Sequence, residues 1–309
     1  MKNIKIKDYY LLITLSLAII FGLLFADKFI LLAPFTTLFL MIILFLAALK
    51  LPLKIIVNSI DESKERVTIL IATIFILVAL PIIVFFITYF IYPNLAPAFF
   101  ILTLAPVGVN IPFLIDLLKG NKGLGLLLVI STSLLAPLTI PLLIYLFLGG
   151  IVDINFISVL TLIVKVIFIP FGIATIVRYF ISDKIDQISD KFNDISTFFL
   201  GFLFAGIVAD HSKIIIETLL SWTGIFYLTA LLILFFFLYR FSYFFFFWLG
   251  EKERFTIASC ALFMNFVLMI VVANQFFYQY DKIIIPLILS IIPWTISLII
   301  LKQYRMLKK

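Results

Sequence analysis

Four residues that disturb helices lie within seven positions of one long apolar run, Leu95–Leu118. They are Pro106, Gly108, Asn110 and Pro112. A proline inside a helix lacks a backbone donor and clashes with the carbonyl four residues earlier, so we expect the helix to be broken here. Opened backbone within a bilayer needs protein or water as a partner, and a broken helix is a frequent binding site in transporters. A proline kink without a ligand is the alternative interpretation, because proline and glycine are common in membrane helices.

Lys165 is a charged residue inside another apolar run, Phe156–Ile176, about ten residues from either end. A charge at that depth is costly, and by default it marks a functional site. A buried lysine can bind an anion or carry a proton, because burial lowers its pKa readily. The alternatives are a side chain that extends to the membrane surface and one that pairs with Asp116 or Glu217.

Uncharged polar side chains in the apolar runs add groups that could hydrogen-bond to a ligand. They are Asn110, Thr132, Asn265 and Asn274. Asn110 and Asn265 are 155 residues apart, half of the 309-residue chain, so they occupy matching places in its two halves. The alternative for Asn265 is a hydrogen bond between neighbouring membrane helices.

Several chemistries are excluded by residues that the chain lacks. Its one cysteine, Cys260, excludes an internal disulfide and a cysteine-based metal cluster, and we interpret it as a small packing residue. Its one histidine, His211, cannot form a histidine pair for a metal. No glycine-rich phosphate loop and no nucleophile beside a base is present, so we predict no enzyme activity, no cofactor and no metal.

The elements that must position these residues are membrane helices. The chain is 65% hydrophobic and 13% charged, with a mean hydropathy of +1.29, which predicts an all-α polytopic membrane protein in a lipid bilayer. The predicted spans are Tyr9–Phe25, Phe29–Leu49, Val67–Ile91, Leu95–Leu118, Gly123–Gly149, Phe156–Ile176, Ile195–Ala209, Gly224–Trp248, Phe255–Tyr278 and Ile283–Leu301. The longest hydrophilic connection is the amphipathic segment Ser182–Asp194.

The basic residues predict the orientation of these spans. With both termini in the cytoplasm, 19 of the 23 basic residues lie on the cytoplasmic side or at its edge. The other four are Lys28, Lys165, Lys213 and Lys282. This asymmetry fixes the orientation and favours an even number of spans. The net charge of +7 is therefore interpreted as a topology signal, and no nucleic-acid partner is predicted.

The spans form two sets of five, in residues 1–154 and 155–309. Because each set has an odd number of spans, the second set enters the membrane in the opposite orientation to the first. Inverted repeats of this kind are a known transporter design.

Short motifs along the chain resemble the bile acid:sodium symporter superfamily. They are the charged loop before Val67, Pro81, the turn Lys119–Asn121, the segments Ser131–Pro141 and Arg254–Ala258, and the pair Met264–Asn265. The resemblance covers nearly the whole length. It implies ten helices in two inverted halves of five, with helices four and nine broken and crossing at mid-membrane. It also implies a core of helices 3–5 and 8–10 that moves against a panel of helices 1, 2, 6 and 7, which gives alternating access.

The chain departs from the family at the places that hold its two sodium ions. These places are occupied here by Ile76, Ile111, Pro112, Gly125, Val129, Cys260 and Met264. A hard cation such as sodium needs several oxygen ligands, which these side chains do not offer, and no carboxylate remains to balance its charge. We therefore expect a member that does not use the family's sodium sites. Arsenite export is disfavoured, because the thiol used by arsenite-exporting relatives lies in helix four, where this chain has none.

Together these observations predict a secondary transporter of the cell membrane that moves a small organic anion. Broken half-helix N-termini could hold its carboxylate, and Lys165 could also carry a coupled proton. The predicted substrate-binding residues are Asn110, Pro112, Thr132, Lys165, Cys260, Met264 and Asn265. A non-transporting receptor or scaffold on the same fold, or an exporter of another solute, is the alternative. A channel is disfavoured by the lack of a charged ring or a selectivity-filter motif.

Overall fold

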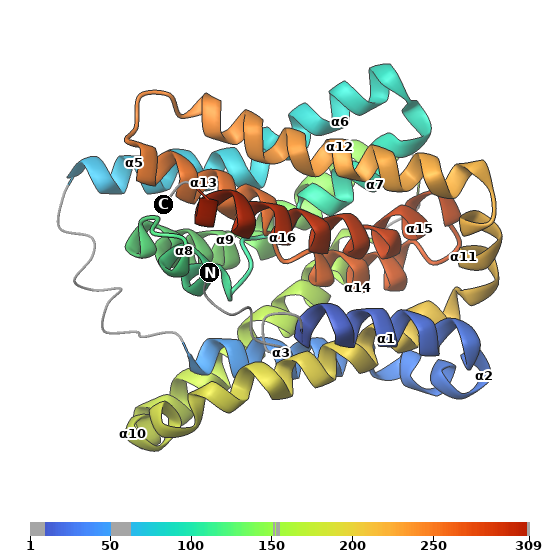
Figure 1. Cartoon of the computed structure of the whole chain (residues 1–309), viewed down its shortest axis with the longest axis horizontal. Coiled ribbons are helices and arrows are strands. Elements are labelled where there is room, and N and C mark those ends of the chain that lie inside the picture. Colours follow the sequence, from blue (N-terminus) through green and yellow to red (C-terminus); the bar gives the residue numbers. More distant parts are fainter. Residues whose placement is uncertain (1–9, 51–62, 151, 153–154, 308–309) are drawn as a thin grey trace. The chain divides into compact units, whose positions relative to one another are not determined.

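The computed structural model describes residues 10–50, 63–150, 152 and 155–307, and the regular structure within them is helical (Figure 1). Seven helices in this part of the chain are long and apolar enough to cross a membrane. They are Ala26–Leu49, Arg66–Ile91, Lys122–Leu148, Phe156–Ser182, Lys191–Asp210, Trp222–Phe245 and Asp281–Leu301. Three shorter apolar helices are Tyr10–Leu24, Pro93–Thr103 and Phe266–Phe276. Each of these helices overlaps one predicted span, and the chain is an all-α polytopic membrane protein.

The chain divides into two compact units. The first contains Met1–Leu51 and Lys165–Gly224, and the second contains Pro52–Val164 and Ile225–Lys309. Each unit therefore joins segments from both halves of the sequence, because the chain leaves the first unit after the second predicted span and returns to it within the sixth.

The first unit is built mainly from α1 (Tyr10–Leu24), α2 (Ala26–Phe29), α3 (Thr36–Leu49), most of α10 (Phe156–Asp210) and α11 (Ser212–Leu219). A 3₁₀ segment, Ile30–Phe35, joins α2 to α3. The helices approach closely at two glycines, as is common between membrane helices. A Cβ on Gly22 would lie 2.9 Å from the carbonyl oxygen of Ala205, and one on Gly206 would lie 3.0 Å from the backbone of Leu32.

Helix α10 is 55 residues long and bends at Ile181, whose φ of −135° and ψ of 35° are not helical (Figure 1). The amphipathic segment Ser182–Asp194 continues the helix between two predicted spans. Ile185 and Phe192 of this segment are buried in a cluster with Leu49 and other apolar residues. These contacts anchor the apolar face of the segment to the rest of the first unit. Arg178 holds the bend by donating to the carbonyl of Leu49 and to Asp186 Oδ1, the latter at 2.9 Å.

The second unit contains the remaining helices. They are α5 (Ser63–Ile74), α6 (Leu80–Ile91), α7 (Ala96–Thr103), α8 (Ile111–Leu117), α9 (Lys122–Leu148), α12 (Trp222–Phe245), α13 (Glu251–Leu262), α14 (Phe266–Phe276), α15 (Asp281–Leu289) and α16 (Ile291–Leu307). A short 3₁₀ turn, Pro93–Leu95, leads into α7.

A π-helical segment, Phe75–Ala79, joins α5 to α6 and accommodates Pro81. Here the N–H of Leu80 bonds to the carbonyl of Phe75, five residues earlier. The wider turn relieves the clash that a proline makes with the carbonyl four residues back, so one apolar span continues through Pro81. Phe75 itself is buried, and its ring stacks on that of Phe245 with centroids 4.5 Å apart.

Candidate functional site

Two helices of the second unit are interrupted. In the first, α7 ends at Thr103 and α8 begins at Ile111, so the predicted break in Leu95–Leu118 is present. In the second, α13 ends at Leu262 and α14 begins at Phe266, within the predicted span Phe255–Tyr278. Helix α13 begins at Glu251, four residues before this predicted span, and Glu251–Arg254 form its first turn.

The two interruptions bind each other through their backbones. Val107 and Met264 form an antiparallel bridge. Beside it, the N–H of Gly108 donates to the carbonyl of Phe263 at 3.1 Å, and the N–H of Asn265 donates to the carbonyl of Pro106 at 2.7 Å. Each break thus supplies partners for polar groups that the other break has opened, which removes the cost of leaving them unpaired. These segments, 104–110 and 263–265, are called the crossing below.

The crossing requires glycine at position 108. A Cβ on Gly108 would lie 2.8 Å from the carbonyl oxygen of Phe263, the same oxygen that accepts the Gly108 hydrogen bond. Only a residue without a side chain allows the two backbones to approach this closely.

Thr132 of α9 braces the crossing from the side. Its hydroxyl accepts the N–H of Val107 at 3.1 Å and donates to the carbonyl of Leu128 at 2.6 Å. The side chain is fully buried. The hydroxyl therefore both donates and accepts inside the protein, which gives Thr132 a structural role at the crossing.

The other predicted residues of the second unit lie at or beside the crossing. Met264 is buried within it, and Asn265 is half-buried and caps α14, accepting the N–H of Leu268 at 3.4 Å. Asn110 is exposed directly before α8, and Pro112 is buried in the first turn of α8. Cys260 is fully buried on α13, one turn before the second break.

Ile115 is a residue at this site that sequence reasoning missed. It is fully buried on α8, and a Cβ on Gly125 would lie only 2.5 Å from its Cδ1 atom. A Cβ on Gly120 would likewise lie 2.7 Å from its Cγ2 atom. The isoleucine therefore fills the space beside both glycines with hydrocarbon. The glycine at position 125 was the available signal, since it leaves room that a neighbour must occupy.

The turn Lys119–Asn121 ties the α8–α9 pair to the start of α13. The N–H of Asn121 donates to Thr256 Oγ1 at 2.9 Å, and its side-chain amide donates to Glu253 Oε1 at 3.2 Å. Asn121 Oδ1 also accepts the N–H of Leu124 and so caps α9. Lys119 has a φ of 60°, which closes the turn. This turn therefore fixes the position of α13, before the second break, against α8 and α9.

Trp294 of α16 packs against both sides of the second break. Its ring centroid is 5.7 Å from that of Phe263 and 4.9 Å from that of Phe266. Its indole nitrogen is buried without a hydrogen-bond partner among the described residues, as is the hydroxyl of Ser259. An unpaired buried donor is costly. No periodicity or motif in the sequence indicated that Trp294 would lie at the second break.

Lys165 lies apart from these residues in sequence and belongs to the first unit. It is exposed on α10, between apolar neighbours such as Val164 and Phe168 that are also exposed. Within the described ranges no acidic side chain pairs with it, and Asp116 instead forms an ion pair with Lys122 at 2.8 Å. Those ranges also contain no group of three residues suited to a metal ion.

A comparison with family models finds one match. The model described as the Sodium Bile acid symporter family matches residues 14–218. The matched stretch begins in α1 and ends in α11, so it contains the first break and Lys165. A search of curated proteins finds no match to this chain.

Proposed function

Since the chain belongs to the sodium bile acid symporter family, we propose that it is a secondary transporter that moves a small organic anion across the cell membrane by alternating access. The family's members are transporters rather than enzymes. Its printed name specifies bile acids, which are organic anions, as the solute class of the family. An anionic substrate agrees with the placement of a cation, Lys165, in the middle of an apolar helix.

The proposed architecture is ten spans in two inverted repeats, residues 1–154 and 155–309, with both termini in the cytoplasm. The first unit would be the panel of helices 1, 2, 6 and 7, and the second unit the core of helices 3–5 and 8–10. The division of the chain into two compact units supports this assignment, because alternating access by this route requires two bodies that each keep their own packing. The basic residues support the orientation.

We further propose that transport is not coupled to sodium at the family's sites. The observation that carries this proposal is the pairing within the crossing, where the Thr132 hydroxyl and the backbone N–H groups bond to protein partners. The places of the family's ligands hold buried apolar side chains, including Ile76 and Val129. Ile115 fills the space beside Gly125. Buried apolar side chains offer no oxygen ligand to a hard cation.

Lys165 is the residue that we propose to bind the anion. An exposed charge among apolar side chains, without an acidic partner in the described part of the chain, has its counterion supplied by a ligand or by solvent.

The test measures both binding and movement. Purified full-length protein is melted in detergent with taurocholate and with a panel of small carboxylates, in sodium chloride and in potassium chloride. The same compounds, radiolabelled, are offered to proteoliposomes. We expect stabilisation and uptake in both salts for the parent and loss of both in Lys165→Ala. Lys213→Ala removes another exposed cation of the same unit and should retain them. Uptake that needs sodium would contradict the proposed coupling.

A receptor or scaffold without transport is the second candidate. The apolar, internally paired crossing favours it, because loss of ion ligands on a retained fold removes the driving ion. It predicts stabilisation by a ligand but no movement of radiolabelled solute in either direction. An exporter of another solute would instead release preloaded solute from the same vesicles.

A further inference from the structure

A second cation that has no acidic partner among the described residues lies on α12, in the second unit. Arg240 is exposed, five residues before the end of the helix at Phe245. Large apolar side chains one or two turns away on the same helix face are exposed as well. They are Ile233, Phe236 and Phe244. Positions three or four apart on a helix share a face, so Arg240 interrupts an otherwise continuous apolar stripe.

The guanidinium group of Arg240 lies between two of these aromatic rings. Its central carbon is 4.8 Å from the ring centroid of Phe244 and 6.0 Å from that of Phe236. Both rings are themselves largely exposed, Phe236 to 68% and Phe244 to 54%. The rings hold the cation by cation–π attraction but leave its N–H donors without an anion among the residues that the structure describes.

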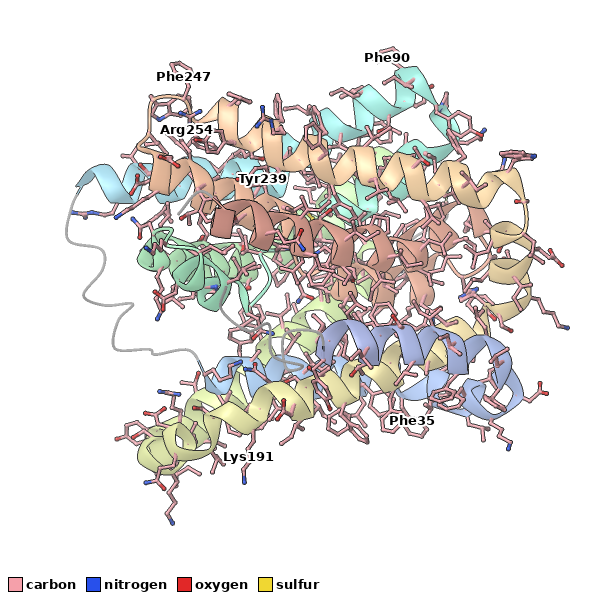
Figure 2. All side chains as sticks on the ribbon, in the orientation of Figure 1. Phe35, Phe90, Lys191, Tyr239, Phe247 and Arg254 are labelled. Atoms are coloured by element: carbon pink, nitrogen blue, oxygen red, sulfur yellow. The ribbon has the colours of Figure 1, made fainter. Side chains whose placement is uncertain are left out.

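Arg254, in the same region, is an arginine whose guanidinium group does have a hydrogen-bond partner within the protein. Its Nε donates to the carbonyl of Tyr243 at 3.0 Å, and its guanidinium lies 4.2 Å from the Tyr243 ring centroid. Arg254 thus joins the end of α12 to the first turn of α13, as Figure 2 shows at the turn that also carries Phe247. In the part of the chain that the structure describes, Arg240 makes no such contact with the backbone, and its side chain is exposed.

The end of α12 has the composition of a membrane surface. Phe247 and Trp248 are exposed directly after the helix, and Lys252 is exposed on the following turn. Tryptophan and other aromatic residues gather at the level of lipid headgroups. Five residues of helix span about 8 Å, a distance over which an arginine side chain can extend toward that level.

We propose that Arg240, Phe236 and Phe244 form a binding site for the phosphate of an anionic phospholipid. Guanidinium donates two parallel hydrogen bonds to a phosphate, and the acyl chains of the same lipid cover the exposed phenylalanines. The bilayer supplies this ligand at the depth where Arg240 lies. The site fixes the depth of α12 in the membrane, and it is independent of which solute the protein carries.

The test uses the full-length protein in mixed micelles that contain equal amounts of phosphatidylglycerol and phosphatidylcholine, with retained lipids counted by native mass spectrometry. Arg240→Gln should lower the retention of phosphatidylglycerol by about tenfold, the size expected when a hydrogen bond to a charged group is lost. Lys252→Gln removes one charge from the same end of α12 and should change retention by less than about twofold. Phe244→Leu keeps the apolar surface and should give an intermediate loss.

Three results would overturn the proposal. Retention in Arg240→Gln that equals the parent's would show that the arginine does not hold the lipid. An equal loss in Lys252→Gln would show a nonspecific charge effect. Competition by inorganic phosphate as strong as that by added phosphatidylglycerol would show that the acyl chains contribute nothing.

Discussion

The crossing and the first span of α10, Phe156–Ser182, treat polar groups in opposite ways. At the crossing, backbone groups opened by two breaks pair with each other and with Thr132. Around Lys165 the helix is unbroken, yet a charge stands among exposed apolar side chains, and the described residues give it no acidic partner. Paired groups hold a structure together, whereas an unpaired charge is available to a ligand. We infer that the crossing is a scaffold and that the charge recognising the substrate lies outside it.

The largest effect should come from opening the crossing. Gly108→Ala places a Cβ 2.8 Å from the Phe263 carbonyl oxygen, so the two backbones must separate and their hydrogen bonds must lengthen. We expect a loss of about 3 kcal/mol, the upper range for overpacking a tight site, measured as a lower melting temperature in detergent. On α10, a Cβ on Gly172 would meet no atom within 4 Å. Gly172→Ala is the control and should leave the protein as stable as the parent or slightly more stable. If the two variants lower the melting temperature equally, the close backbone approach at Gly108 is not what makes the crossing sensitive.

The second effect concerns a single hydroxyl. Thr132→Val keeps the shape but leaves the buried N–H of Val107 without its acceptor. This should cost about 2 kcal/mol, since an unpaired buried donor bears its full desolvation penalty. Thr175→Val on α10 is the matched control, because the Thr175 hydroxyl is exposed and donates only to the Phe171 carbonyl of its own helix. The control should change the melting temperature little. If Thr132→Val is equally mild, Thr132 is free to bind a ligand after all.

Sequence reasoning located the first break because its signals are local: two prolines, a glycine and an asparagine within seven positions disfavour a regular helix. The second break has no such cluster, and it was expected only from the family resemblance. Sequence reasoning missed Ile115 and Trp294, whose roles depend on which side chains meet them from distant helices. The amphipathic pattern of Ser182–Asp194 showed that the segment has an apolar face, but not which helices would cover it. Ile185 and Phe192 find their apolar partners on α3 and elsewhere on α10, and such tertiary partners have no signature within the segment.

The third effect concerns Lys165 on α10, the charge that we propose binds the transported anion. Lys165→Ala should lower the affinity for the transported anion by about tenfold or more, because a hydrogen bond to a charged group contributes about 1.5–3 kcal/mol. The melting temperature without ligand should stay the same or rise, since no partner within the described residues loses a contact. Lys165→Arg keeps the charge and should retain part of the binding. A variant that melts lower but binds normally would mean that Lys165 is structural and the crossing recognises the ligand.

The smallest expected effect is that of sodium itself. Replacing potassium by sodium should change the melting temperature of the parent by less than about 1 °C, because a ligand stabilises a protein only in proportion to its occupancy. Here Ile115 occupies the space beside Gly125, and the Thr132 hydroxyl is engaged. Ile115→Ala opens that space without adding an oxygen ligand, so it too should remain insensitive to sodium. If sodium stabilises the parent and potassium does not, an ion binds at the crossing, and the crossing is then a binding site rather than a scaffold. Sodium sensitivity in Ile115→Ala only would show that the isoleucine side chain, rather than the lack of oxygen ligands, excludes the ion.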